Sequence, residues 1–523
     1  MITGATVDPY APALYNAGQV RNLDRTAIEE FGVEGFELMR RAGRAAFRQL
    51  RRHWDQVRHI TVLCGGGNNG GDGYVIAALA VQQGLSVRCI AVTDPARLRG
   101  TALRAYEYAG EQGVVVESSE ALGETGFEEA LRGTDLVVDS LLGTGLSGDV
   151  RAPFDAIIHQ LNASEVPVLA IDIPSGLCSD TGRVLGCAVE AVVTVTFIAR
   201  KAGLYTGKAR DHTGQVVFDD LAVDPGVYEA EPEPVAHYHD WPAASRWLPR
   251  RRPTTHKGEC GRILVVGGDQ GMGGAGLLAS EAALRTGAGL VFWATRQMHL
   301  GAAIARCPEV QARAVEHGNE LDALLEAVDV VVLGPGLGRS AWGQQMFQRV
   351  LAFSGPVVAD ADALNLIAAS PDGLSGRDNW ILTPHPGEAS RLLGCSTADI
   401  EADRYSAVRS LSGRYGNTCV LKGAGTLVAS AGSATAVVAG GNCGMASAGM
   451  GDVLSGVLGA LLGQKLTPHQ AAITGCALHA RAGDIAVRRH GAMGMLAQDV
   501  IAALGVAVSP GSDIPGERVS VDE

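Results

Sequence analysis

Short apolar runs that end in glycine-rich turns alternate with helix-like stretches along most of this chain. "HITVLC" (59–64) leads through "GGGNNGGDG" into "YVIAALAV", and "DLVVDSLLGTG" and "VPVLAIDIPSG" end in the same way. Strands spaced by helices build βαβ units, whose parallel sheet is covered by helices on both faces. The alternation therefore predicts an α/β fold, preceded by an amphipathic segment from Val20 to Leu50.

The alternation stops once and then restarts. Residues 229–256 are rich in proline and charge, as linkers often are, and new strand-like runs such as "RILVVGG" and "AGLVFWAT" follow from Gly261. A chain of 523 residues is also too long for a single core. We therefore expect one domain over residues 1–228, a linker or entry segment over 229–256, a second domain over 257–508, and a flexible tail over 509–523.

Bulk composition excludes several classes of protein. Apolar residues make up 46% of the chain and charged residues 19%, which predicts packed cores rather than disorder. A net charge of −13 gives no attraction for nucleic acid or an anionic membrane. The ten cysteines include no C-x-x-C pair, and the first residues do not resemble a signal peptide. We expect a cytoplasmic protein with no nucleic-acid or membrane partner.

The first glycine-rich loop carries two asparagines and one acid. The pattern G-x-G-x-x-G occurs at 65–70, 143–148 and 271–276, so the pattern alone is weak, but the first copy lies between a strand and a helix. Backbone N–H groups there can bind an anion. Asn68, Asn69 and Asp72 would suit a hydroxylated ligand or a monovalent cation. The alternative for the two asparagines is turn chemistry in a left-handed conformation, and local sequence favours neither.

Two further acids end buried strands in the first half. Asp139 closes "LVVD" and Asp172 closes "LAID", and each is followed by a turn rich in glycine or serine. Carboxylates at the carboxyl ends of parallel strands face the crevice where such sheets bind ligands. A single acid at such a position is more often a helix cap or turn residue. Asp72, Asp139 and Asp172 together favour a shared crevice.

In the second half, "GMASAGMGDVLSG" runs from a loop of small residues into an apolar helix. Successive N–H groups there could stabilise charge on a transferred phosphoryl group, while Asp452 takes a proton from the attacking hydroxyl. The alternative is a helix N-cap aspartate. That alternative weakens beside "TPHPGE" (His385, Glu388), "ADADAL" (Asp360, Asp362) and "LKGAGT" (422–426). A P-loop lysine motif, a G-x-S-x-G elbow and an H-E-x-x-H helix are all missing from the sequence.

These motifs together resemble a known family almost end to end. The chain is similar to the bifunctional NAD(P)H-hydrate repair enzymes, in which an NAD(P)H-hydrate epimerase is fused to an ADP-dependent NAD(P)H-hydrate dehydratase. The first half carries the resemblance through "LMRRAG", "GGGNNGGDGYV", "VDSLLGTGLSG" and "IDIPSGLCSDTG", and the second through "GPGLG", "ADADALNL", "TPHPGE", "LKGAGT" and "GMGDVLSG". The resemblance implies a Rossmann-like three-layer domain followed by a ribokinase-like α/β domain.

The resemblance also implies site residues. In the first domain, Asp172 would be the acid–base residue, and a potassium ion would be held by Asn69, Asp139 and Ser175. The hydrate would be bound there by Asn68, Asn69, Gly70, Gly71, Asp72, Gly143, Thr144, Gly145, Leu146, Ser147, Gly148, Asp149 and Asp172. In the second domain, Asp452 would be catalytic, the hydrate would contact Ala275, Gly336, His385 and Asp452, and the adenine nucleotide would contact Lys422, Gly423, Ala424, Gly425, Thr426 and Gly451.

The implied substrates are hydrated NADH and NADPH (NADHX and NADPHX). ADP is the implied co-substrate and magnesium the implied metal of the second domain, and we expect a homo-oligomer. The first domain would interconvert the R and S hydrates. The second would phosphorylate the 6-hydroxyl of the S form from ADP, so that phosphate is expelled and NAD(P)H is restored.

Two alternatives remain open from the sequence. One is a ribokinase-like kinase for a vitamin precursor or sugar, fused to a non-catalytic nucleotide-binding domain. The other makes the first half a ligand-binding or scaffold module, although Asn69, Asp139 and Asp172 argue against lost catalysis. Ala448 stands where the family often has glycine, and we expect that it does not need a positive φ.

Overall fold

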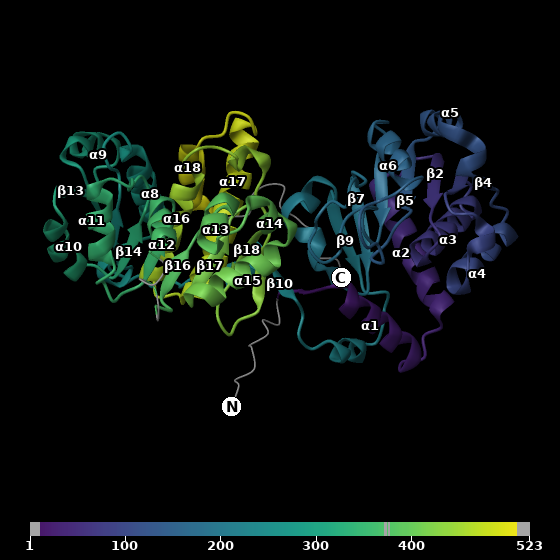
Figure 1. Ribbon diagram of the computed structural model, residues 1–523, viewed down its shortest axis with the longest axis horizontal. Helices are drawn as coiled ribbons and strands as arrows, with labels where there is room; N and C mark the ends of the chain where they lie inside the picture. Colours follow the sequence, from purple (N-terminus) through teal and green to yellow (C-terminus); the bar gives the residue numbers. More distant parts are fainter. Residues whose placement is uncertain (1–10, 371–373, 375–376, 510–523) are drawn as a thin grey trace. The chain divides into compact units, whose positions relative to one another are not determined.

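The computed structural model describes residues 11–370, 374 and 377–509. Pro12–Ala236 form one compact unit, and the chain from His237 onward forms the other (Figure 1). We call them the N-terminal and C-terminal units. In the described ranges, no helix is both long and apolar enough to cross a membrane. The expected tail lies outside the described residues from position 510 onward.

The N-terminal unit is built on a parallel sheet with a reversal in strand order. Its strands are β2 (His59–Cys64), β3 (Ser86–Ala91), β4 (Val116–Ser118), β5 (Leu136–Ser140), β6 (Val168–Ile171), β7 (Val193–Phe197) and β9 (Gln215–Asp219), in the spatial order β4-β3-β2-β5-β6-β7-β9. All neighbours pair in parallel. The chain starts in the middle, moves out to β4 and returns to β5. The β2 and β5 ends therefore border the switch point where such sheets bind ligands.

Helices cover both faces of this sheet, which confirms the three-layer prediction. They are α1 (Ala17–Glu29), α2 (Gly35–His53), α3 (Asn68–Gln82), α4 (Gly100–Glu111), α5 (Ser119–Arg132) and α6 (Phe154–Asn162). One core packs the helices α1, α2, α3 and α4 against one face of the sheet. A separate core packs α5 and α6 against the other face. The segment Val20–Leu50 divides into α1 and α2, and Gly32 between them has a φ of +68°. Two short strands, β1 (Ala13–Tyr15) and β8 (Arg200–Lys201), pair in parallel.

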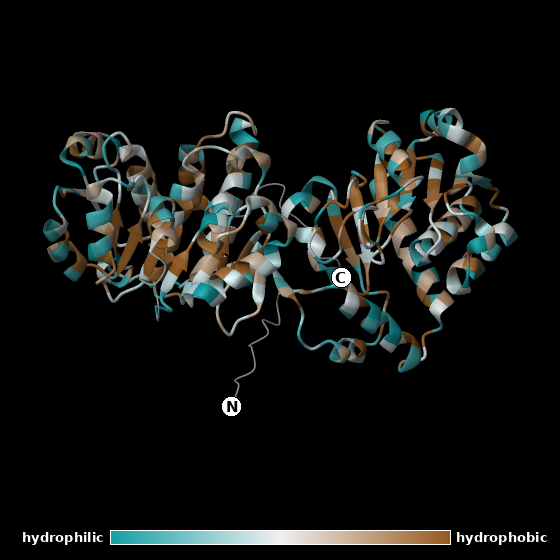
Figure 2. Cartoon of the chain, viewed as in Figure 1, coloured by the Kyte–Doolittle hydropathy of each residue, from teal (hydrophilic) through white to brown (hydrophobic). Residues whose placement is uncertain are grey.

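The C-terminal unit repeats this plan with different details. Its parallel strands are β11 (Arg262–Val266), β12 (Leu290–Thr295), β13 (Gln311–Ala314), β14 (Val330–Leu333), β15 (Val357–Ala359), β16 (Trp380–Leu382) and β17 (Thr418–Leu421), in the order β13-β12-β11-β14-β15-β16-β17. The antiparallel strands β18 (Thr426–Ala429) and β19 (Thr435–Val438) extend the sheet beyond β17. Figure 2 shows that the strands of both sheets are strongly hydrophobic, as expected for sheets covered on both faces.

Four helices of the C-terminal unit pack with its sheet into one apolar core. Its helices are α7 (Trp241–Ser245), α8 (Gly273–Arg285), α9 (Leu300–Arg306), α10 (Asp322–Glu326), α11 (Ala341–Val350), α12 (Asp362–Ala369), α13 (Pro386–Leu393), α14 (Thr397–Ala402), α15 (Arg404–Tyr415), α16 (Met450–Gly463), α17 (Pro468–His490) and α18 (Ala497–Ala507). The core joins α8, α16, α17 and α18 to the sheet. A Cβ at Gly456 would lie 2.0 Å from the carbonyl oxygen of Ala279, so α16 and α8 approach through bare backbone.

Part of the expected linker has regular structure. Strand β10 (Ala236–His239) and helix α7 fall within residues 229–256. Ala244 of α7 is buried, and its carbonyl accepts a hydrogen bond from the Thr474 hydroxyl of α17 at 3.1 Å. Proline and charge marked this segment as a linker, but residues 229–236 belong to the N-terminal unit and residues 237–256 to the C-terminal unit.

The glycines of the 65–73 loop are required by close packing. A Cβ at Gly65 would lie 1.8 Å from the carbonyl oxygen of Leu141, and one at Gly70 would lie 2.1 Å from the carbonyl oxygen of Gly65. At Gly73 a Cβ would lie 2.0 Å from the Ser140 hydroxyl. The loop after β2 therefore presses directly against the end of β5. Gly67 differs, because nothing lies within 4 Å of the position its Cβ would take.

This contrast gives a stability prediction. Gly65→Ala should destabilise the N-terminal unit by about 3 kcal/mol, because the Leu141 carbonyl cannot move without disturbing β5. A loss of that size lowers the melting temperature of a unit this large by roughly 6–12 °C. Differential scanning calorimetry of the whole chain would measure it. Gly67→Ala is the matched control, with an expected loss of about 1 kcal/mol at most. Equal shifts for the two variants would contradict the packing argument.

Candidate active sites

The two asparagines of the first loop lie inside a helix. Gly67 is the N-cap of α3, so Asn68 and Asn69 are its first two residues. Neither is among the described non-glycine residues with positive φ. The left-handed turn proposed as their alternative role is therefore wrong. Asn68 is exposed and Asn69 is buried, so the two side chains have different environments.

Asn69 belongs to a buried polar cluster at the ends of β2 and β5. Its amide nitrogen donates to the Leu142 carbonyl at 3.2 Å, but its buried side-chain oxygen has no hydrogen-bond partner. Asp139 is fully buried and accepts from the Ser175 hydroxyl at 2.6 Å and from the Ser175 N–H at 2.8 Å. The Ser175 hydroxyl in turn accepts from the Leu142 N–H at 2.8 Å. Burial raises the pKa of Asp139 to about 6, and its hydrogen bonds oppose that rise.

This cluster is rich in oxygen and has one carboxylate. An orphaned buried amide oxygen is costly, and each such atom calls for an explanation. A weakly hydrated cation beside Asn69, Asp139 and the Leu142 carbonyl would supply the missing partner for the amide. The loop 143–149 packs next to the same cluster, since a Cβ at Gly143 would lie 3.2 Å from that of Asn69.

Asp172 stands at the end of β6 in an unusual backbone conformation. Its φ is +68°, which non-glycine residues rarely adopt and which tends to mark functional sites. Its carboxylate accepts from the ammonium of Lys201 and, at 3.4 Å each, from the Thr196 hydroxyl and the Phe197 N–H. Lys201 is 1% exposed. Lys201 was not expected at this site from the sequence, and it places a positive charge directly beside Asp172.

Two more acids share the electrostatic environment of Asp172. Burial raises the pKa of Asp72 well above its usual range, and the charges of Asp172 and Asp24 add to the rise. Burial likewise raises the pKa of Asp24 to about 6, which Lys201 partly offsets. Asp24 lies on α1 and was not predicted as a site residue. Its sequence context, "NLDRT", lies in the amphipathic segment expected from Val20 to Leu50.

In the C-terminal unit, the loop after β11 and the loop after β14 meet near α8. A Cβ at Gly336, which has a φ of +60°, would lie 2.5 Å from the Met272 carbonyl oxygen and 3.2 Å from the Cβ of Ala275. The structure therefore brings together Ala275 and Gly336, two of the four residues expected to contact the hydrate in this unit. The carbonyl of Gly336 accepts from the Asp269 N–H at 2.7 Å.

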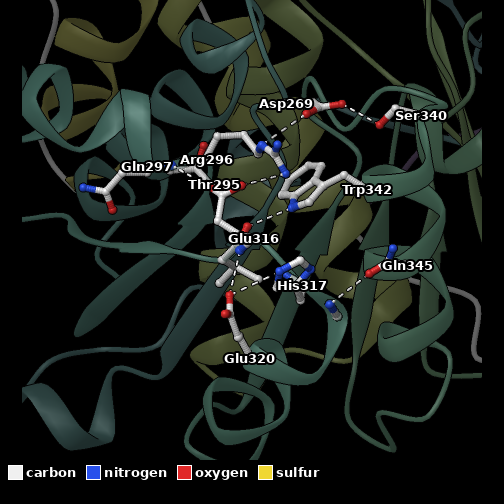
Figure 3. Close-up of polar contacts among 12 residues, drawn as sticks. Asp269, Thr295, Arg296, Gln297, Glu316, His317, Glu320, Ser340, Trp342 and Gln345 are labelled. Atoms are coloured by element: carbon white, nitrogen blue, oxygen red, sulfur yellow. Dashed lines mark hydrogen bonds and ion pairs between the residues drawn. The ribbon is translucent and has the colours of Figure 1, made fainter.

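Asp269 connects this loop to a charged network (Figure 3). It accepts from the Ser340 hydroxyl at 2.6 Å, and Arg296 Nε lies 3.7 Å from its carboxylate. Arg296 also pairs with Glu316 at 3.0 Å and lies over the Trp342 ring. An open polar groove of about 550 Å³ borders the network, lined by His317, Gly318, Asn319, Ala341, Gln344, Gln345, Gln348 and Arg349. None of these residues was expected at a site from the sequence.

Charged residues that follow β15 and β16 gather around Lys422, which follows β17. The Lys422 ammonium lies 2.6 Å from Asp360, which follows β15, and 3.7 Å from Glu388 of α13. Asp360 is 2% exposed and also accepts from the Ser455 hydroxyl of α16 at 2.8 Å. Lys422 holds the pKa of Asp360 below its usual value against the effect of burial. A Cβ at Gly451 would lie 3.3 Å from the Lys422 ammonium, so the two predicted nucleotide-binding loops meet here.

His385 caps α13 at the rim of this group. Its Nδ1 accepts from the Gly387 N–H at 3.0 Å, and its Nε2 lies 3.5 Å from Glu388. Burial and the positive charge of Lys422 lower the pKa of His385, which favours the neutral imidazole. Its structural role as a cap is compatible with contact to a ligand, because the ring is exposed.

Asp452 lies in the first turn of α16 but is not its N-cap. Gly449 takes that position with a φ of +88°, and Ala448 is not among the described non-glycine residues with positive φ. The expectation for Ala448 is therefore confirmed, and the N-cap alternative for Asp452 is wrong. Burial, with the charge of Asp360 second, raises the pKa of Asp452 to about 7, against a smaller opposing effect of Lys422.

A backbone irregularity lies beside the same group. Ala361 has a φ of +48° and a ψ of −116° between Asp360 and Asp362. Such strain persists only where surrounding contacts enforce it. Those contacts are visible on both sides: Asp360 is held by Lys422 and Ser455, and Asp362 accepts from the Gly338 N–H at 2.9 Å.

Comparison with known proteins identifies both units. Residues 35–203 match the family model described as YjeF-related protein N-terminus, and residues 263–505 match the model described as NAD(P)H-hydrate dehydratase. The bifunctional NAD(P)H-hydrate repair enzyme Nnr of Escherichia coli is 45% identical over 500 residues, covering 95% of this chain and 94% of the relative. The chain belongs to the bifunctional NAD(P)H-hydrate repair enzymes.

Two solved structures similar to this repair enzyme each cover about half of the chain. A ribokinase-like superfamily protein from Enterococcus faecalis is 28% identical, covers 52% of this chain and 94% of that protein, and has a TM-score of 0.49. The ADP/ATP-dependent NAD(P)H-hydrate dehydratase from Bacillus subtilis, co-crystallised with ATP/Mg²⁺, is 26% identical over 51% of this chain and 96% of that one, with a TM-score of 0.45.

Proposed function

We propose that this repair enzyme restores hydrated NADH and NADPH through two separate sites. The N-terminal unit interconverts the R and S hydrates, and the C-terminal unit dehydrates the S form with ADP, giving AMP and phosphate. The observation that carries the proposal is that each family-matched unit gathers its motif acids at the carboxyl ends of its strands: Asp139 and Asp172 in one, Asp360 and Asp452 in the other.

In the C-terminal unit we assign the base to Asp452. Its carboxylate takes the proton of the 6-hydroxyl as that oxygen attacks the β-phosphorus of ADP, and the bond to AMP breaks. N–H groups at the start of α16, which have no partner within the helix, stabilise the charge on the transferred group. The ring-nitrogen lone pair then expels phosphate, and loss of a proton from carbon five restores the double bond. Lys422 to Thr426 and Gly451 hold the nucleotide.

A magnesium ion fits this assignment if it arrives with the nucleotide. Within the described ranges, no three His, Cys, Asp or Glu residues gather in a metal-binding arrangement. Magnesium commonly takes only one or two carboxylates, with waters and phosphate oxygens for the rest. Glu388 is the acid we propose beside it, since its 3.7 Å contact with Lys422 is looser than the 2.6 Å contact of Asp360. When bound, the ion would neutralise phosphate charge.

In the N-terminal unit we assign acid–base chemistry to Asp172 and potassium binding to Asn69, Asp139 and Ser175. The buried, unpartnered oxygen of Asn69 supports the potassium site, because amide oxygens with a single carboxylate suit a weakly hydrated monovalent ion. The hydrate would lie against residues 68–72 and the loop 143–149. Inversion at carbon six would proceed near the Asp172 carboxylate.

Single substitutions should separate the two activities. Asp452→Asn should abolish ADP-dependent recovery of NADPH absorbance from the S hydrate but leave R–S interconversion intact. Asp172→Ala should do the reverse: the S hydrate is repaired at the wild-type rate, while repair of the R hydrate falls to the spontaneous rate. Chromatography of the epimers with the absorbance assay would measure both. Release of a phosphorylated product instead of AMP and phosphate would favour the kinase alternative.

The raised pKa of Asp452 predicts a pH dependence. A base acts in its ionised form, and a pKa of about 7 leaves that form in the minority below pH 7. We expect kcat/KM for S-hydrate dehydration to rise about tenfold per pH unit below pH 7 and to level off above pH 8. Measurement between pH 6 and 9 at saturating ADP would test it, with AMP affinity over the same range as the control. A flat profile would contradict the assignment.

The potassium site predicts selective dependence on the cation. Epimerisation should be faster in KCl than in LiCl at equal ionic strength, and KCl should raise the melting temperature of the N-terminal unit. Asn69→Ala should remove both effects, because it deletes the unpartnered oxygen. Asn68→Ala, at the adjacent exposed position, should keep the potassium-dependent stabilisation, whatever it does to KM. If Asn69→Ala responds to KCl like the wild type, this site is not the one that binds potassium.

A further inference from the structure

Arg404, the first residue of α15, is a buried cation of the C-terminal unit. It is 1% exposed, and the helix that it begins packs against β17 and β18 (Figure 1). A positive charge in the first turn of a helix opposes the helix dipole, and a buried guanidinium loses its hydration. Both effects are unfavourable. An arginine buried at this position therefore needs compensating contacts.

The guanidinium of Arg404 binds the start of the loop 422–426, which we propose holds the nucleotide. Its Nη2 donates to the Lys422 carbonyl at 3.1 Å and to the Leu421 carbonyl at 3.3 Å. Its Nη1 donates to the carboxylate of Glu401, on α14, at 3.0 Å. Glu401 supplies the negative charge that a buried guanidinium requires. Arg404 therefore joins α14 and α15 to the end of β17, at the point where the loop begins.

The backbone of the loop lies directly on this guanidinium. Gly423 has a φ of +137°, and a Cβ there would lie 2.9 Å from Arg404 Nη2. A side chain at position 423 would therefore have to displace the arginine. Lys422 is held at both ends, because its carbonyl accepts from Arg404 while its ammonium lies 2.6 Å from Asp360. Arg404 thus fixes the backbone of the same lysine that contacts the acids of the proposed active site.

We propose that Arg404 is a positioning residue for ADP in the C-terminal unit. Peptide carbonyl oxygens carry partial negative charge, and Arg404 holds those of Leu421 and Lys422 in the protein interior, away from the anionic phosphates that the loop receives. It also keeps the loop in one conformation before the nucleotide arrives, which lowers the cost of binding. Arg404 acts through the loop, and this role rests on the proposed ADP-dependent dehydration.

The test measures nucleotide kinetics of the whole chain with two substitutions at Arg404. Arg404→Met removes the charge and these three contacts but keeps much of the side-chain volume. The KM for ADP in S-hydrate dehydration should rise about 10- to 100-fold, as expected when hydrogen bonds to a charged group are lost. The KM for the S hydrate at saturating ADP should stay close to the wild-type value. Arg404→Lys keeps the charge but lacks the planar fork, so its KM for ADP should also rise, but less.

Two controls separate positioning from folding. Arg409→Met removes an exposed arginine from the same helix and should leave the KM for ADP unchanged. Epimerisation by the N-terminal unit, measured in the same samples, should be unchanged in all three variants. Calorimetry of the C-terminal unit would show how much stability each substitution removes.

Each outcome decides a different statement. If the wild-type chain does not consume ADP while it restores NADPH from the S hydrate, the proposed function fails and this role for Arg404 fails with it. If it does, but the Arg404 variants keep the wild-type KM for ADP and lose only kcat or stability, Arg404 is a structural residue and the inference is overturned. If Arg404→Met loses the calorimetric transition of the C-terminal unit, Arg404→Lys alone decides. If both variants lose it, Arg404 is required for folding, which also overturns the inference.

Discussion

A single type of contact organises both sites. The glycine that follows a central strand (β2 or β11) packs against a backbone carbonyl that follows the neighbouring strand (β5 or β14). In the N-terminal unit a Cβ at Gly65 would lie 1.8 Å from the Leu141 oxygen, and in the C-terminal unit one at Gly267 would lie 2.0 Å from the Pro335 oxygen. Each contact lies where the strand order of its sheet reverses, between β2 and β5 in one unit and between β11 and β14 in the other. No side chain fits there, so the two loops meet through their backbones at the edge where such sheets bind ligands.

The sites also share an electrostatic plan. Each contains one lysine surrounded by more acids than it can neutralise: Lys201 in the first site and Lys422 in the second. At the second site, the acid in direct contact with the lysine has a lowered pKa, while the pKa of a neighbouring acid is raised. Asp360 has a lowered pKa beside Lys422, and Asp452 has one of about 7. Acids with separated pKa values are the arrangement that acid–base chemistry at neutral pH requires.

Strand ends decide which residues share these sites. Ala275, Gly336, Asp360, His385 and Lys422 are far apart in sequence, but all follow parallel strands of one sheet or lie on the helices that follow those strands. A parallel sheet brings every carboxyl end to the same edge, so motifs can be placed together once the strands are recognised. The strands β2, β5, β6, β11 and β14 were recognisable because each is a buried, apolar run. The short, polar β4 and β13 were not, because they lie at sheet edges and their side chains are not fully buried.

The sequence by itself determined the α/β class, the two-part organisation and the acids at strand ends, because these depend on local periodicity and on residues adjacent to it. It also carried, through its motifs, the resemblance that the family comparison confirms. Only the tertiary structure decided that Lys201 and Asp24 join Asp72 and Asp172, that Asn69 has a buried oxygen without a partner, and that Gly449 rather than Asp452 caps α16. Those facts depend on burial and on contacts between distant segments, which no local pattern in the chain encodes.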